Sequence, residues 1–249
     1  MLTYVSYAVR SFIRALDNLL RRLGRAPDYV VFILEGSYPQ LRPPRGNFWQ
    51  RRLAPPKTSL QELAEQFRQV AGDPRVHGVV LHLRRLRMPL AQLQTLADLI
   101  RELRTAGKRV VAWSASYYDS ANYYVACAAD EILLQPGGSV YPLGLHRGFL
   151  FLADALERIG LQADIIQISP YKTAGDLLTR RGLSDEARQM ANWLIDESYA
   201  QFTQAIAAGR DLDEAGARAL IDHAPYTDLE AAHAGVVDTL IGEEDLRRT

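Results

Sequence analysis

The chain has 249 residues, of which 48% are hydrophobic, and its formal net charge is zero. This length allows one large domain or two small ones, and the neutral balance argues against nucleic-acid binding. The single cysteine, Cys127, excludes an intrachain disulfide and any multi-cysteine metal site. The five histidines show no metal-ligand spacing, so we expect no metal and no other cofactor.

Residues 2–23 carry apolar side chains at helical spacing, with arginines between them. The apolar positions are Val5, Val9, Phe12, Ile13, Leu16, Leu19, Leu20 and Leu23. This pattern predicts a basic amphipathic helix, which suits either an anionic membrane surface or a partner subunit. We therefore expect a membrane- or partner-binding element over residues 1–24 and a single domain over residues 25–249.

The rest of the chain predicts an alternation of strands and helices. A strand at 29–34 is followed by an extended, Pro- and Arg-rich arm at 36–57, where the prolines prevent regular structure. Helices are predicted near 59–70, 89–106, 119–128, 148–159, 185–208, 213–222 and 228–234, and strands at 78–83, 109–113, 131–134, 163–168 and 236–241. This rhythm predicts an α/β fold with a mostly parallel sheet.

The chain has three lysines against 26 arginines. Arginine keeps its proton in proteins, whereas a desolvated lysine can lose it. Lys57 and Lys108 lie in plain contexts, the first after two prolines and the second in a turn before a strand. Lys172 lies in a loop between the predicted strand at 163–168 and a polar helix, which is a common place for catalytic groups. Lys172 is therefore the first candidate for a catalytic residue.

Ser120 is the candidate nucleophile. It begins a predicted helix that follows the strand at 109–113, so it would lie near backbone N–H donors. Ser114 and Ser116 lie in the same segment. The simpler interpretation is that Asp119 or Ser120 only caps the helix, and the residues by themselves favour the cap.

Two segments resemble the signal peptide peptidase A family of Ser–Lys peptidases. Residues 171–176 and 183–188 look like the lysine segment of that family, and residues 120–132 resemble its serine segment, in which Ser-Gly-Gly-Tyr-Tyr precedes Ala-Asp-x-Ile. Residues 137–144 take the place of a Gly-Ser-Ile-Gly loop. The resemblance extends over residues 28–245, with several short motifs in the family's order.

The resemblance implies a Clp protease/crotonase-like fold and ring-shaped oligomers. It implies Ser120 as nucleophile and Lys172 as general base, often contributed by different protomers or halves. It also implies peptide substrates, such as signal peptide remnants, and a peripheral place on a bacterial-type inner membrane. A lysine base must be neutral, and burial lowers the pKa of an amine.

The chain departs from the family at three places. The short forms have an Asp-Ser-Pro-Gly-Gly loop that supplies oxyanion donors, but residues 83–90 here contain no glycine. Ala121 and Asn122 replace the two glycines after the serine, and the Gly-Ser-Ile-Gly loop reads differently at 139–144. These changes resemble the N-terminal half of the long, two-repeat form, which supplies the lysine while a homologous half supplies the serine.

Three interpretations follow from these departures. In the first, the chain is one repeat that supplies Lys172 to a serine-bearing second half or partner. In the second, copies of this chain pair Ser120 and Lys172 across protomers; each missing oxyanion donor would cost about 10²–10³-fold in rate. In the third, the chain is a catalytically inactive repeat that serves ring assembly or membrane docking.

Overall fold

A computed structural model describes residues 28–42, 44 and 58–246. The predicted helix at 2–23 and most of the predicted arm at 36–57 lie outside these residues. The central element is a five-stranded parallel sheet of order β1-β2-β3-β5-β8. Its strands are β1 (Tyr29–Gly36), β2 (Gly78–Leu86), β3 (Arg109–Ser114), β5 (Glu131–Leu134) and β8 (Thr239–Leu240). The predicted α/β fold with a mostly parallel sheet is confirmed.

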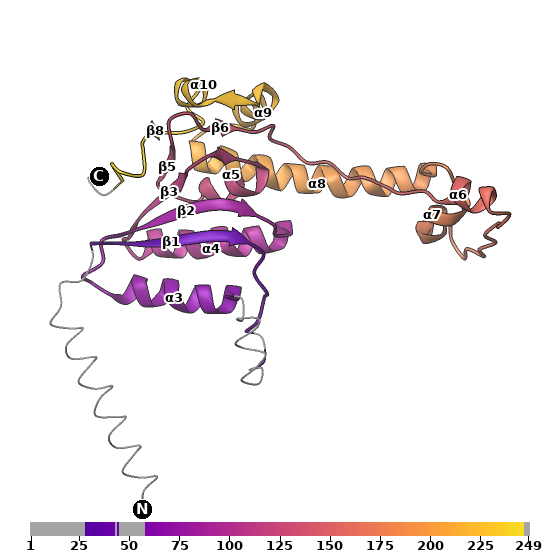
Figure 1. Cartoon of the computed structure of the whole chain (residues 1–249), viewed down its shortest axis with the longest axis horizontal. Coiled ribbons are helices and arrows are strands. Elements are labelled where there is room, and N and C mark those ends of the chain that lie inside the picture. The colour runs from indigo at the N-terminus through magenta and orange to yellow at the C-terminus, as the bar shows by residue number, and fades with distance from the viewer. Residues whose placement is uncertain (1–27, 43, 45–57, 247–249) are drawn as a thin grey trace, which may run out of the picture.

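Three helices cover one face of this sheet: α3 (Leu60–Gly72), α4 (Leu90–Thr105) and α5 (Ser120–Ala126) (Figure 1). The start of α3 is fixed by a capping box between Ser59 and Glu62. Apolar residues of the helices, such as Phe67 and Ile100, pack with alternate strand residues, such as Leu81, in one large buried core. This core forms because one face of each strand and one stripe of each helix are apolar.

The second face of the sheet has a much thinner cover. Val80, Val111, Trp113 and Leu133 form a small separate core with residues of the C-terminal tail. The Trp113 indole N–H donates to the carbonyl oxygen of Ile241 at 3.1 Å. The C-terminal tail therefore covers the part of this face that lies near Trp113.

A second, three-stranded sheet lies beside the carboxyl end of the first. It contains β4 (Tyr117–Tyr118), β6 (Ser139–Val140) and β7 (Tyr226–Thr227), and α9 (Glu214–His223) and α10 (Asp228–His233) flank β7 in the chain. The Tyr118 hydroxyl donates to the Leu133 carbonyl at 2.8 Å, which joins the two sheets. Two-residue strands carry no periodic signal, so the sequence did not predict this sheet.

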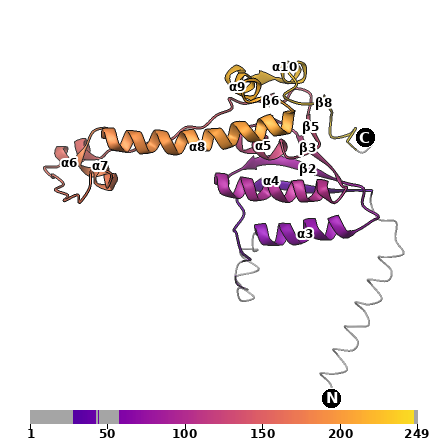
Figure 2. The same ribbon diagram turned by 180° about the vertical axis from the view of Figure 1, so that it is seen from behind.

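The long helix α8 (Asp185–Arg210) joins the sheet to a part of the chain that projects away from it (Figures 1 and 2). Its last turns pack on α5, with the rings of Phe202 and Tyr124 stacked at 6.2 Å. Gly209 lies so close to the backbone of Cys127 that a side chain there would overlap it. We call residues 145–200 the projecting segment. It includes α6 (Ala153–Arg158), the 3-10 turn η1 (Thr173–Gly175) and α7 (Asp176–Thr179). The helices α6 and α7 lie at the far end of α8 (Figure 1).

Three predicted elements were wrong in extent or kind. Residues 163–168 form no strand, because the chain there has no partner strand; Ile166 and Ile168 are 93% and 89% exposed. The helix predicted at 148–159 shortens to α6, whose N-cap residue Leu152 offers no side-chain acceptor. The strand predicted at 236–241 shortens to β8, because the N–H groups of Val236 and Val237 donate to Ala231 and close α10.

Within the described residues, no helix is both long enough and apolar enough to cross a membrane.

Candidate functional site

Ser120 is the first residue of α5, and its hydroxyl is held by the chain itself. The helix is capped by Asp119, whose carboxylate accepts from the Asn122 N–H at 2.9 Å. The Ser120 Oγ donates to the carbonyl oxygen of Gly144 at 2.8 Å and accepts from the N–H of Gly144 at 3.0 Å. The hydroxyl is therefore engaged both as donor and as acceptor, with no basic side chain taking its proton.

The backbone donors of the segment that replaces the family's glycine loop are also engaged. The Leu86 N–H donates to Oδ1 of the buried Asn122 at 3.2 Å, and the Arg87 N–H donates to the carbonyl of Gly36 at 2.7 Å. An oxyanion needs donors that are free to meet it. These two N–H groups are thus satisfied inside the folded chain and do not point to a substrate.

A cavity of about 400 Å³ lies at the carboxyl ends of β1, β2 and β3. Its walls include Arg85, Ser116 and Asn122, but Ser120 is not among its lining residues. The open space at this edge of the sheet and the candidate nucleophile therefore lie apart.

Lys172 lies in a well-defined turn of the projecting segment. Its N–H donates to the carbonyl of Ser169 at 3.0 Å, and η1 follows directly. The next turn is fixed by the buried carboxylate of Asp176, which accepts from the hydroxyl of Ser184 at 2.7 Å and pairs with Arg180 at 3.3 Å. A backbone hydrogen bond therefore defines the turn at Lys172, and side-chain contacts hold the turn that follows it.

The Lys172 side chain itself is exposed and makes no hydrogen bond or ion pair with any described residue. The segment around it exposes an unusual amount of apolar surface. Its exposed large hydrophobic side chains include Phe149, Leu150, Ile159, Leu161, Ile166, Ile168, Trp193 and Leu194. Exposed apolar side chains in such number are a feature of interaction surfaces.

The structure does not bring Ser120 and Lys172 together within one chain. Ser120 begins α5, which packs against β2 and α4, whereas α7, which follows the Lys172 turn and η1, lies at the far end of α8 (Figures 1 and 2). Ser120 and Lys172 of the same chain therefore do not form a pair in this structure.

Lys108, which the sequence placed in a plain context, is the lysine that the structure buries. Its Nζ donates to the carbonyl oxygens of Asp73 and Val76, both at 2.7 Å. These contacts join the end of α3 to the start of β3. Lys108 is thus a structural residue. Its position in a turn before a strand does not predict its hydrogen bonds to these two carbonyl oxygens.

The single cysteine is also structural. Cys127 is buried, and burial raises the pKa of its thiol to about 12, so the thiol stays protonated at neutral pH. Among the described residues, no three His, Cys, Asp or Glu side chains gather closely enough to hold a metal ion.

An ion pair fixes the end of α8 against the strand region. The guanidinium of Arg210 donates to both carboxylate oxygens of Asp238, at 2.7 and 3.0 Å, and to the carbonyl of Gly235. The Ile132 N–H donates to the same carboxylate at 2.7 Å. Burial alone would raise the pKa of Asp238, but these hydrogen bonds outweigh it and hold the pKa below its usual value.

Known structures define the class of fold. The chain is similar to ClpP1 of Listeria monocytogenes, with a TM-score of 0.51 and 12% identity over 88% of this chain and 94% of that one. It is also similar to a peptidase of Plasmodium falciparum, with a TM-score of 0.50 and 8% identity over 86% of this chain and 96% of that one. At such low identity these likenesses establish the fold alone, which is that of the Clp proteases.

Sequence comparison identifies the family. The family described as "Peptidase family S49" matches residues 102–249, which is more than half of the chain. The chain is 26% identical to the chloroplastic serine protease SPPA of Arabidopsis thaliana over 76% of the length of this chain. It is 30% identical to Protease 4 of Haemophilus influenzae over 64% of the length of this chain. The chain therefore belongs to peptidase family S49, the signal peptide peptidase A family. It spans 28% and 26% of the length of these two relatives.

Proposed function

We propose that this chain is the lysine-supplying unit of a Ser–Lys endopeptidase that cleaves remnant signal peptides or other membrane-associated peptides. The observation that carries the proposal is the placement of Lys172, on a fixed turn in a segment whose apolar side chains face water. Membership of family S49 supports the reaction class.

The proposed reaction is nucleophilic acyl transfer. A neutral Lys172 amine accepts the proton of a serine hydroxyl while the serine oxygen attacks the peptide carbonyl carbon. The resulting ammonium returns a proton to the leaving amine, and water then hydrolyses the acyl-enzyme. The amine can be neutral near physiological pH only if it is withdrawn from water.

A partner surface would provide that withdrawal. Ile166, Ile168 and Trp193 are mostly exposed in the single chain, and they share the projecting segment with Lys172. A second copy of the chain, or a homologous serine-bearing half, could cover these side chains and the lysine together. The proposal includes the pairing of units through this segment, which the exposed apolar side chains support.

The serine is proposed to come from a homologous serine-bearing unit, and not from Ser120 of this chain or of a second copy. The Ser120 hydroxyl is engaged in both directions by Gly144. The Leu86 and Arg87 N–H groups, which lie where the family has its glycine loop, are bound by Asn122 and Gly36. A substrate at Ser120 would have to displace several of these hydrogen bonds.

A second candidate function is a catalytically inactive repeat that serves ring assembly or membrane docking. The apolar surface of the projecting segment favours assembly in either case. The two candidate functions differ in the role of Lys172. A scaffold has no need of a lysine next to the turn that Asp176 and Ser184 hold.

We further propose that the protein associates with the surface of a membrane, of the bacterial inner-membrane type, through the amphipathic pattern of residues 2–23. Deleting these residues is then expected to release the protein from anionic vesicles. Unchanged vesicle binding of the deleted form would reject this part of the proposal.

The serine assignment is tested with a fluorophosphonate probe and intact-mass analysis. We expect no adduct on Ser120 in the natural chain, while a serine peptidase of the same fold is labelled in parallel. An adduct on Ser120 that disappears in Lys172→Ala would contradict the proposal. It would instead show that copies of this chain pair Ser120 and Lys172 across protomers.

A further inference from the structure

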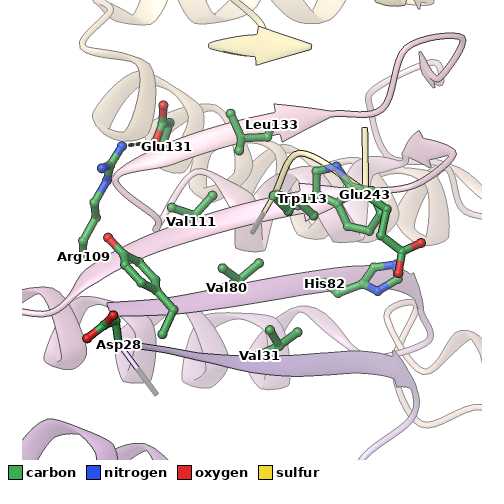
Figure 3. Close-up of a pocket in the computed structure, with 12 residues that line it drawn as sticks. Asp28, Val31, Val80, His82, Arg109, Val111, Trp113, Glu131, Leu133 and Glu243 are labelled. Carbon is green, nitrogen blue, oxygen red and sulfur yellow. Dashed lines mark hydrogen bonds and ion pairs between the residues drawn. The ribbon is translucent and has the colours of Figure 1, made fainter. Parts of the chain in front are cut away.

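The second face of the parallel sheet is open at the β1 side. Figure 3 shows Val31, Val80, Val111 and Leu133 pointing to this face from four neighbouring strands. Parallel sheets are normally covered on both faces, and residues 29–34 are apolar at every position, as in a strand buried on both sides. Yet Val31 and Ile33 are 59% and 54% exposed. The described residues thus leave part of an apolar sheet face without its cover.

The open face forms a hollow with charged ends. The cavity has a volume of about 540 Å³, with the four apolar strand residues as its floor. Carboxylates line its ends: Asp28 precedes β1, Glu131 pairs with Arg109 at 2.6 Å, and Glu243 lies beside His82 (Figure 3). Because Arg109 neutralises Glu131, the main feature of the hollow is its apolar floor, which suits an occupant with an apolar face.

The chain itself contains such an occupant directly next to the hollow. Residues 1–27 lead into Asp28, which is one of the lining residues. Residues 2–23 combine an apolar stripe with Arg10, Arg14, Arg21 and Arg22. As a helix they would be about 33 Å long, against about 26 Å for the eight residues of β1. Length and chain continuity match, and with the apolar stripe against the sheet the four arginines lie on the side of the helix that faces away from it.

We propose that residues 2–23 pack as a helix across this face of their own sheet, antiparallel to β1, with the apolar stripe over Val31 and Ile33. With Leu23 near the start of β1, Leu16 lies about 10 Å back along the helix axis. Val31 and Ile33 lie about 7 and 13 Å along the strand from Tyr29. Leu16 is therefore placed over these two side chains, whereas Asn18, about 200° around the helix from Leu16, faces water.

This packing has a consequence for membrane association. The segment has one apolar stripe, which cannot cover the sheet and enter a membrane at the same time. The sheet face and a membrane surface therefore compete for residues 2–23, and a protein in solution holds the stripe against the sheet. The packing itself does not depend on the proposed peptidase activity.

Disulfide trapping in the full chain tests the packing. Leu16→Cys combined with Val31→Cys is expected to form an intramolecular disulfide under mild oxidation, and Asn18→Cys combined with Val31→Cys is the matched control. Cys127 does not interfere, because its thiol is buried. A disulfide in the first pair alone, seen as monomer on non-reducing gels and by mass, supports the proposal.

Three results would overturn the packing. A disulfide between chains would assign the hollow to a second copy. Equal trapping of both pairs would show a segment without a fixed face, and trapping of neither would leave the sheet face to another occupant.

The competition is tested with vesicles that contain phosphatidylglycerol. Val31→Arg should weaken the packing and raise vesicle binding several-fold above that of Leu229→Arg, which adds the same charge at an exposed position of α10. Equal binding of the two variants would reject the competition. Loss of binding on deletion of residues 2–23 separately tests whether the segment binds a membrane at all.

Discussion

The helix-covered side of the sheet and the projecting segment differ in how far their apolar side chains are buried. Around α3, α4 and α5, apolar side chains such as Phe67 and Ile100 are almost fully buried by contacts within the chain. In the projecting segment, α6 has no buried residue, and Ile166 and Ile168 face water. The first region buries its apolar side chains by its own packing, whereas the second leaves many of them exposed in the single chain.

The lysines of the two regions show what this difference means. Lys108 is buried at the sheet, where its Nζ donates hydrogen bonds to two carbonyl oxygens and has a structural role. Lys172 has a defined backbone turn but a side chain without a partner among the described residues. The region that exposes its apolar side chains is thus also the region that carries the proposed base.

The largest expected effect is on catalysis. Lys172→Arg should lower the peptidase activity of the assembled protein by about 10²–10⁴-fold, because a guanidinium stays charged and cannot act as a base. Activity is measured on a fluorogenic peptide with small apolar side chains, and circular dichroism checks the fold. Activity within a factor of a few of the natural protein would remove Lys172 from the mechanism.

Next in size is the effect on the ion pair that holds the end of α8. Arg210→Met should lower the free energy of unfolding by about 3 kcal/mol, because it leaves the half-buried carboxylate of Asp238 without its main partner. Arg101→Met, which removes an exposed pair with Asp98, should cost less than about 0.5 kcal/mol. Urea unfolding at pH 7 compares the two, and equal losses would contradict the account of this pair.

The same pair predicts a dependence on pH. The pKa of Asp238 is below its ordinary value of 3.8 in the folded protein, so the unfolded chain takes up this proton first as the pH falls. The pair's stabilisation is therefore complete above that ordinary value and is lost as the pH falls through the lower, folded value. The difference in the free energy of unfolding between the natural protein and Arg210→Met should become smaller below about pH 4. A constant difference would contradict the assignment.

A smaller effect separates the two lysines directly. Lys108→Met should lower the free energy of unfolding by about 2 kcal/mol, because two buried carbonyl oxygens lose their donor. Lys172→Met should change it by less than about 0.5 kcal/mol, because its side chain is exposed in the single chain. Thermal or urea unfolding of dilute protein compares them. A larger loss for Lys172→Met would show that Lys172 already has a structural partner.

The elements that the sequence predicted well are those that carry their own signals. The helices near 59–70 and 89–106 and the apolar strands at 78–83 and 109–113 have local patterns, and the structure has them where they were expected. The strand expected at 163–168 was wrong because an apolar run does not reveal whether a partner strand exists. Its apolar residues Ile166 and Ile168 are instead exposed in the single chain.

The site could be predicted only in part for a similar reason. Motifs pointed to Ser120 and Lys172, but their distance apart in the fold depends on how far α8 projects from the sheet. The capture of the Ser120 hydroxyl by Gly144 joins residues 24 positions apart. The two carbonyls that bind Lys108 lie 32 and 35 positions away from it. A local sequence pattern does not indicate contacts between residues so far apart in the chain.

The most direct test of the proposal is whether assembly covers Lys172. The chain has three lysines, so labelling with a small amine-reactive reagent followed by mass spectrometry reports on each of them. We predict that Lys172, which is exposed in the single chain, is protected from the reagent in the assembled protein. In Ile166→Asp, which places a charge on the exposed apolar surface, Lys172 should react as it does in the single chain. Equal labelling of Lys172 in the assembled natural protein and in Ile166→Asp would contradict its role as a base that the partner surface covers.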